Sequence, residues 1–127
     1  MIKVPVSAGE LLDKISILRI KKDRLTDAGK RRNVVFELMQ LEAIADTELK
    51  GKGEYDPLFM ALLTVNAKLW DIEEAKRDCE RRKAFDAHFI ALARAVYLEN
   101  DRRAHLKRAL NEMLSSEIVE EKSYAAY

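Results

Sequence analysis

Apolar side chains recur every three or four residues along most of this chain, which is the spacing of an α-helix with one buried side. The clearest run alternates steps of four and three, at Leu58, Leu62, Val65, Leu69 and Ile72. Three other segments have a similar apolar stripe: one begins after Ser7, one extends from about Arg31 to Leu49, and one begins after Asp86. The pattern predicts an all-α fold, an antiparallel bundle of four or five helices in a single domain over residues 1–127.

Residues at the expected helix ends have the chemistry of helix caps. Ser7, with a glutamate three residues later, has the spacing of a capping box, in which the hydroxyl accepts a hydrogen bond from a free amide. Asp56 precedes Pro57, which the first turn tolerates because its missing N–H needs no partner there. Asp86 is the expected cap of the last helix. Gly29 is the expected left-handed residue after the first helix.

The two ends of the chain do not follow the helical pattern. The first six residues, MIKVPV, alternate apolar and other side chains, which predicts a short extended segment. The last residues, SSEIVEEKSYAAY, mix acidic with apolar side chains. We expect this tail to dock on the bundle, because docking would bury apolar area at roughly 25 cal/mol per Å². A disordered tail that folds on a partner protein is the alternative. The apolar tail residues are Ile118, Val119, Tyr124 and Tyr127.

The first helix has apolar side chains on two sides. At about 100° per residue, Ile17 and Ile20 lie opposite the main stripe, which contains Leu11, Ile15 and Leu18. Such a helix is either central in its own bundle or shared with a second subunit. The charged residues nearby favour the second interpretation. Together with the tail, Ile17 and Ile20 are therefore the predicted interaction residues of a homodimer.

Composition narrows the function classes. The chain has 23 basic and 22 acidic residues and a net charge of +1, whereas dedicated nucleic-acid binders carry a strong positive excess. The charges are unevenly placed, with −6 over residues 33–74 and +4 over residues 75–113, which suits helices that pair with oppositely charged neighbours. No apolar run reaches the roughly 18 residues that span a bilayer. A single cysteine, Cys79, and no recognisable signal peptide predict a cytoplasmic protein.

A possible anion site depends on the course of the chain at the segment ENDRR. If Asn100 or Asp101 caps a new helix there, Arg103 faces water, which is the simpler expectation because Asn and Asp readily interrupt helices. If the helix continues, cations would converge inside the bundle and would need carboxylates or a bound anion as partners. Asp101 or Glu121 could then act as acid or base. The anion-binding candidates are Arg19, Lys22, Asn100, Arg103 and Lys107.

Other chemistry has little support in the sequence. His88 and His105 are far apart and match no metal-ligand spacing, so no metal is predicted. Cys79 lies among charged residues without a paired histidine, as expected for an ordinary cysteine on a helix surface. The four glycines do not form a phosphate-binding loop. We therefore expect no cofactor.

Two stretches, VSAGELLDKISILRIKKDRL near the start and ARAVYLENDRRAHLKRALN with EEKSY near the end, resemble a family of small bacterial proteins classed as a domain of unknown function. The resemblance covers both ends of the chain and implies no reaction, cofactor or residue role. The chain is also similar in general plan to all-helical chorismate mutases, which bind a dicarboxylate inside a helical dimer. Its long last helix and its tail depart from that pattern.

These observations lead to two functional hypotheses. The first is a self-associating protein-interaction module, with a homodimer and a further protein partner and with no nucleic acid or membrane involved. The alternative is a small binding protein or enzyme for an anionic metabolite, such as a phosphate, a sugar nucleotide or a dicarboxylate, held in a cationic pocket between helices.

Overall fold

The computed structural model describes all 127 residues and contains four α-helices and no strand. The helices are α1 (Ala8–Arg24), α2 (Ala28–Glu48), α3 (Asp56–Arg82) and α4 (Ala87–Met113). The predicted all-helical fold is therefore confirmed, with four helices. None of them combines the length and the apolar character that crossing a membrane requires.

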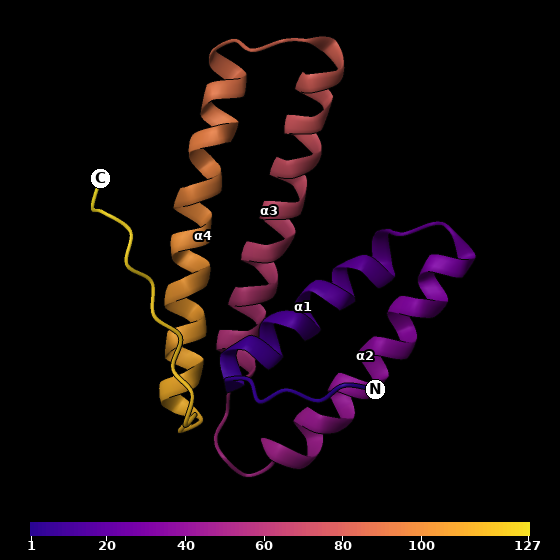
Figure 1. Cartoon of the computed structure of the whole chain (residues 1–127), viewed down its shortest axis with the longest axis vertical. Coiled ribbons are helices and arrows are strands. Elements are labelled where there is room, and N and C mark those ends of the chain that lie inside the picture. Colours follow the sequence, from indigo (N-terminus) through magenta and orange to yellow (C-terminus); the bar gives the residue numbers. More distant parts are fainter.

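The helices form two hairpins of unequal length that meet at one end of the molecule (Figure 1). In the shorter hairpin α1 lies against α2, and in the longer one α3 lies against α4. Helix α1 also contacts both α3 and α4, whereas α2 contacts α1 alone. The far half of the α3–α4 hairpin therefore extends beyond the other two helices, and residues 114–127 run beside α4 (Figure 1).

Local hydrogen bonds explain where the first two helices begin. The Ser7 hydroxyl accepts from the amide of Glu10 at 3.0 Å, as a cap should. Asp27 caps α2 in the same way, through the amide of Lys30 at 2.8 Å. The expectation that Gly29 ends the first helix is wrong, because this Asp27 cap already starts α2 and places Gly29 in its first turn.

The two long helices begin differently from each other. Asp86 caps α4 as predicted, accepting from the amide of Phe89 at 3.2 Å. Asp56, in contrast, is the first residue of α3 rather than its cap, and the cap residue Tyr55 makes no side-chain bond to the helix. Pro57 in this first turn compensates in part, since it has no N–H that would need a partner.

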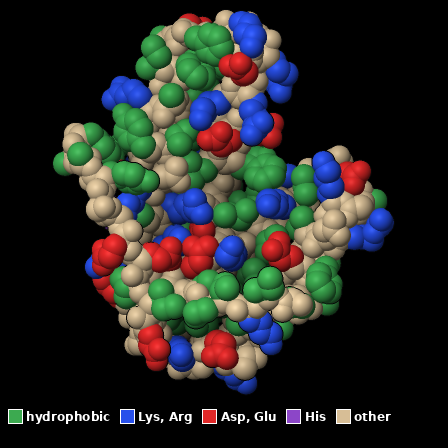
Figure 2. Space-filling view, in the orientation of Figure 1, with side chains coloured by type: hydrophobic (Ala, Val, Ile, Leu, Met, Phe, Trp, Pro, Cys, Tyr) green, Lys and Arg blue, Asp and Glu red, His purple; other side chains and the backbone are tan.

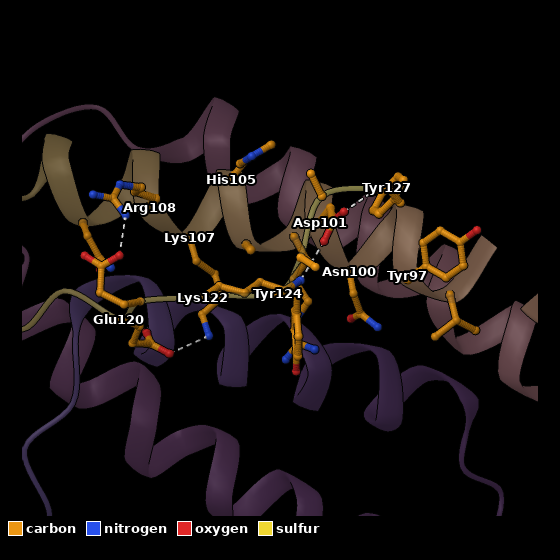
Figure 3. A pocket seen from close by; sticks show the side chains of 17 residues that line it. Tyr97, Asn100, Asp101, His105, Lys107, Arg108, Glu120, Lys122, Tyr124 and Tyr127 are labelled. Atoms are coloured by element: carbon orange, nitrogen blue, oxygen red, sulfur yellow. Dashed lines mark hydrogen bonds and ion pairs between the residues drawn. The ribbon is translucent and has the colours of Figure 1, made fainter. Parts of the chain in front are cut away.

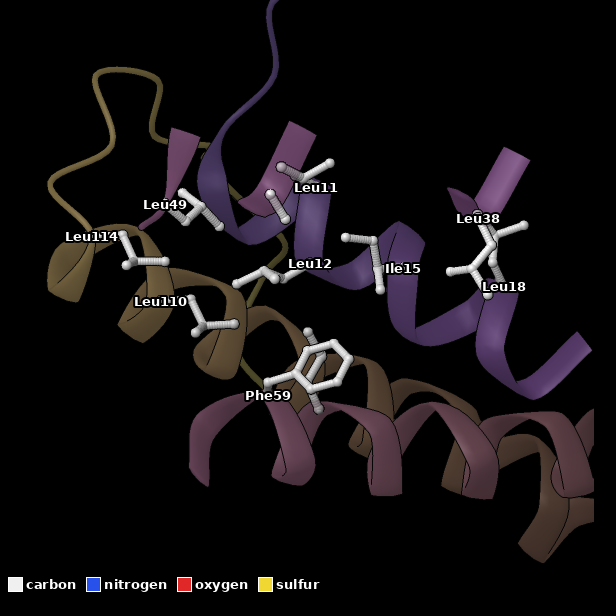
Figure 4. Packing of buried hydrophobic residues seen from close by; sticks show 11 residues of the cluster. Leu11, Leu12, Ile15, Leu18, Leu38, Leu49, Phe59, Leu110 and Leu114 are labelled. Atoms are coloured by element: carbon white, nitrogen blue, oxygen red, sulfur yellow. The ribbon is translucent and has the colours of Figure 1, made fainter. Parts of the chain in front are cut away.

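A core of apolar side chains fills the junction of the two hairpins (Figure 4). Leu12 of α1 lies at its centre, facing Phe59 of α3 and Leu110 of α4. Each fully buried leucine or phenylalanine contributes roughly 1.5–3 kcal/mol to folding. The other core residues are Leu11, Ile15, Leu18, Leu38, Ala45, Leu49, Leu62 and Leu114.

The second side of α1 is covered by the same chain. Gly9, Asp13, Ser16 and Ile20 follow one another at steps of four, three and four, so they share one side of the helix, and all four are buried. Ile20 is only 6% exposed, and Ile17 is half-buried. The expectation that this side meets a second subunit is therefore wrong, because α3 and α4 already cover it.

Helix α4 is continuous through Asn100 and Asp101, so the expected break at ENDRR is wrong. The low helix propensity of Asn and Asp costs only several tenths of a kcal/mol per residue. Packing against α3 along the helix outweighs that cost, and buried Glu99 at this point holds Lys68 of α3 at 2.7 Å. Cys79, expected on a helix surface, is fully buried.

Candidate functional site at the junction of α1, α4 and the tail

Continuity of α4 places Arg103 against a buried carboxylate of α1. Asp13, whose residue surface is only 1% exposed, accepts from Arg103 through both oxygens, at 2.9 Å from Nε and 2.5 Å from Nη2. This two-bond geometry is the strongest form of an ion pair between side chains. The hydrogen bond with Asp13 raises the pKa of Arg103 above its ordinary value. The guanidinium of Arg103 therefore keeps its positive charge beside the Asp13 carboxylate.

Two neutral side chains complete the surroundings of Asp13. Asn66 of α3 donates its amide to Asp13 Oδ1 at 2.9 Å and to Ser16 Oγ at 2.7 Å. The Ser16 hydroxyl donates in turn to the backbone carbonyl of Asp13 at 2.7 Å. No buried side-chain polar atom in the structure lacks a partner. This polar network links α1, α3 and α4, and it fixes their relative positions, because a shifted helix would leave a buried charge unpaired.

Lys107, one turn further along α4, lies between two carboxylates. Its Nζ is 2.6 Å from Glu10 of α1 and 3.1 Å from Glu120 of the tail. Glu120 also accepts from the Ser7 hydroxyl at 2.6 Å. Glu120 therefore connects the tail with Ser7, the cap residue of α1, and with Lys107 of α4.

The charges at this point shift each other's pKa. Burial alone would lower the pKa of Lys107, but hydrogen bonds to Glu10 and Glu120 outweigh burial and raise it above the ordinary value. For Glu120, burial acts to raise the pKa, and the hydrogen bonds from Ser7 and Lys107 lower it overall. Both shifts favour the charged forms, so the contact between tail and helix is strongest near neutral pH.

The start of α1 lies very close to the end of α4. A Cβ atom on Gly9 would be 2.5 Å from the carbonyl oxygen of Lys107, so only glycine fits there. The free amide of Gly9 donates to Asn111 Oδ1 at 2.6 Å, and the amide of Ala8 donates to Ser116 Oγ at 3.2 Å. Side chains from the far end of the sequence thus satisfy the first turn of α1.

The tail continues along α4 through further polar contacts (Figure 3). Glu121 pairs with Arg108 at 3.2 Å, and Lys122 pairs with Asp101 at 2.8 Å. At the end of the tail, Tyr127 donates its hydroxyl to Asp101 as well, and its ring meets that of Tyr97 edge-on at 5.0 Å between centroids. A groove of about 1060 Å³ lies between α4 and residues 120–127. We call this space the tail groove.

Three of the five predicted anion-binding residues meet in this region. Asn100, Arg103 and Lys107 all line the tail groove. Arg19 lies elsewhere, paired with Glu42 at 3.1 Å. Lys22 is exposed near the end of α1 and does not line the groove. The predicted convergence of cations from both helices is therefore wrong for the first helix, since Arg19 and Lys22 lie six and nine residues beyond Asp13 along α1.

The predicted acid or base residues already have cationic partners. Hydrogen bonds from Lys122 and Tyr127 lower the pKa of Asp101, which keeps this carboxylate charged and makes it a poor proton donor. Glu121 is exposed and holds Arg108. No group of three or more His, Cys, Asp or Glu side chains could hold a metal ion.

The apolar residues of the tail are not buried. Tyr124 and Tyr127 are 84% and 79% exposed, and Ile118 and Val119 are exposed too. The expectation that these four side chains are buried on the bundle is wrong, because the tail contacts α4 mainly through charged groups. Its acidic residues do approach the basic helix, as predicted. Figure 2 shows charged side chains of both signs gathered in the middle of this face.

Sequence reasoning missed the buried polar residues that organise this junction. Asp13, Ser16 and Asn66 are placed among apolar neighbours, and no motif marks them. The steps of four and three from Gly9 to Ile20 could have revealed that α1 has a second buried side. The partners of Asp13 and Asn111, in contrast, are separated from them by 90 and 102 residues in the sequence.

No family model, curated protein or solved structure matches this chain. The resemblance of its two ends to a family of unknown function therefore stays a prediction, and the site has to be interpreted from its own geometry.

Proposed function

We propose that this protein is a self-associating protein-interaction module. The observation that carries the proposal is the uncovered outer side of α2. This helix contacts α1 alone, and its outer side exposes Phe36 by 60% and Met39 by 64%, with exposed Ile44 beside them. Exposed apolar patches of this kind mark interaction sites in proteins that are otherwise well packed.

Charge supports a second copy of the chain as the partner. Residues 33–48 of α2 carry four acidic and no basic side chains. The end of the α3–α4 hairpin, residues 76–94, carries six basic and three acidic side chains and exposes Phe85 and Ile90. Two copies can therefore place α2 of each on the hairpin end of the other, matching apolar groups and opposite charges twice. Direct contact between two α2 helices would bring acidic side chains together.

The same proposal covers the position of the tail and the cellular compartment of the protein. We infer that the four helices form an antiparallel bundle and that the tail stays docked on α4. The two hydrogen bonds of Glu120, with Ser7 and Lys107, support the docked position of the tail. A single cysteine that is fully buried suits a reducing compartment such as the cytoplasm.

The anion-binding alternative has weaker support. Arg103 and Lys107 already have carboxylate partners at 2.5–2.9 Å and 2.6 Å, so little free positive charge faces the groove. The other predicted cations lie outside it. An interaction module is the function that this geometry supports best.

Light scattering on three single variants tests the proposal. We expect the unmodified chain at micromolar concentration to have twice its chain mass of 14.6 kDa. Met39→Glu and Phe85→Glu should each give the mass of one chain, because each places a charge in one of the two apolar surfaces. Thr64→Glu adds the same charge at an exposed site on α3 away from both and should leave the dimer intact. A monomeric unmodified chain would end the proposal.

A further inference from the structure

The tail makes contacts along α4 in a defined order. Reading from Glu120 to Tyr127, two acidic side chains meet Lys107 and Arg108, then a basic and an aromatic side chain meet Asp101. Figure 3 shows these residues following the helix in sequence. The charges of the tail and of α4 are complementary at each step.

This contact is extensive but weakly held. Every residue from Glu117 to Tyr127 is exposed, and most of the ion pairs are at the surface, where solvent reduces their contribution. The groove leaves about 1060 Å³ between the tail and α4, so the tail does not fill the space that it covers. Another segment with better contacts could therefore replace it.

The length of the surface indicates the kind of ligand. From Tyr97 to Arg108 the contacts span twelve residues of α4, which is eleven steps of 1.5 Å or roughly 16 Å. A phosphate or dicarboxylate is too short to follow this whole row of contacts. An extended peptide reaches the whole row, as the tail itself does.

We propose that the tail groove is a recognition site for an acidic segment of another protein that has an aromatic residue following its acidic pair, and that the chain's own tail occupies this site until such a segment displaces it. The tail is an autoinhibitory occupant. Because it is tethered beside the groove, it competes at an effective concentration on the order of millimolar. Binding of a partner is therefore weak until the tail is released.

A labelled peptide with the sequence of residues 116–127 tests this proposal on the full-length chain. The comparison is between the unmodified protein and the double variant Glu120→Gln/Glu121→Gln, in which the attached tail has lost both acidic contacts. We expect the peptide to bind the double variant at least about tenfold more tightly by fluorescence anisotropy, because the competing tail is weakened. Thermal melting checks that the variant is folded. Glu121→Gln alone, at an exposed position, provides a second variant with a smaller shift in the same direction.

Two controls identify the site. A peptide in which only the glutamates that correspond to Glu120 and Glu121 are replaced by glutamine should bind neither protein, and adding Arg108→Gln to the double variant should reduce binding of the original peptide. Equal binding to the unmodified protein and the double variant, or none to either, would overturn the proposal. Inorganic phosphate that binds the double variant when the peptide does not would also overturn it, in favour of a small-anion site. The assay does not depend on dimer formation, which involves α2 and the hairpin end, so the two proposals can fail separately.

Discussion

The two halves of the α3–α4 hairpin have opposite surroundings. Near its base, α1 packs against both helices, Leu12 and Leu110 meet in the apolar core, and the buried Asp13 carboxylate pairs with Arg103. Beyond α1, no other helix covers α3 and α4 (Figure 1), and Phe85 and Ile90 are exposed there. One half of the hairpin is therefore complete within a single chain, and the other half has apolar surface that nothing in the chain covers.

This difference separates the residues that hold the fold together from those that are exposed for association. In the closed half every buried polar side-chain atom has a partner, so these polar residues serve to fix the helices relative to one another. The open half and the outer side of α2 have exposed apolar groups with charges of opposite sign. Substitutions in the closed half should reduce stability, whereas those in the open half should reduce association.

The largest expected effect is at Arg103. Arg103→Met leaves the buried carboxylate of Asp13 without a cation and should lower the free energy of unfolding by about 3 kcal/mol, measured by urea denaturation. Arg102→Met is the matched control, because Glu99 keeps its contact with Lys68 at 2.7 Å. It should cost less than about 1 kcal/mol. Similar losses in both variants would mean that the Asp13 pair does not hold the closed half together.

Gly9 should show the next largest effect. An alanine there would place its Cβ 2.5 Å from the Lys107 carbonyl oxygen and 2.9 Å from Asn111 Oδ1, so α1 would have to move away from α4. We expect Gly9→Ala to cost about 1–3 kcal/mol, as over-packing does in other cores.

Gly29→Ala provides the comparison for Gly9. The nearest atom to its Cβ is Asp27 Oδ1 at 3.3 Å, and alanine favours the helix by up to about 1 kcal/mol, so thermal melting should show no loss of stability. Equal destabilisation by the two substitutions would show that close packing of α1 on α4 is not the cause.

The smallest effect concerns the tail and pH. The folded protein lowers the pKa of Glu120 below its ordinary 4.5, so this carboxylate contributes stability above pH 4.5 and loses it as the pH falls through the folded pKa. Glu120→Gln should therefore be less stable than the unmodified chain at pH 7, by under about 1 kcal/mol because the side chain is partly exposed. The difference should shrink as the pH falls below 4.5 and through the lowered pKa of Glu120.

Lys107, the basic partner of Glu120, sets the high-pH limit of the same contact. The pKa of Lys107 is raised above its ordinary 10.5, so its contribution is present below pH 10.5 and disappears as the pH rises through the folded pKa. Glu117→Gln, whose carboxylate makes no ion pair, serves as the control at each pH and should match the unmodified chain. A Glu120→Gln difference that does not shrink as the pH falls below 4.5 would contradict this description of the tail.

Much of the fold could be predicted from the sequence. Periodicity locates the four helices, and Ser7 and Asp86 cap α1 and α4 as their side chains indicate. These predictions succeed because they depend on residues that are neighbours along the chain. The predicted break of the last helix at Asn100 was wrong, because the local preference of Asn and Asp against helix is small compared with packing against α3.

The candidate site could be predicted only in part. Asn100, Arg103 and Lys107 do meet in the groove, but the carboxylates that pair with the two cations come from α1 and the tail, and no local spacing reveals them. The side of α1 with Ile20 was assigned to a partner subunit for the same reason. The uncovered surface lies on α2 instead, because that helix contacts α1 alone.

Disulfide formation between two single-cysteine variants tests most directly whether α2 of one copy meets the hairpin end of another. Gln40→Cys lies beside the apolar groups of α2, Ala87→Cys lies close to Phe85, and the natural Cys79 is buried. Mixing the two variants under mild oxidation should produce a cross-linked dimer, while neither variant alone should cross-link to the same extent. Cross-linking of Gln40→Cys with itself at an equal rate, or none in the mixture, would contradict the account.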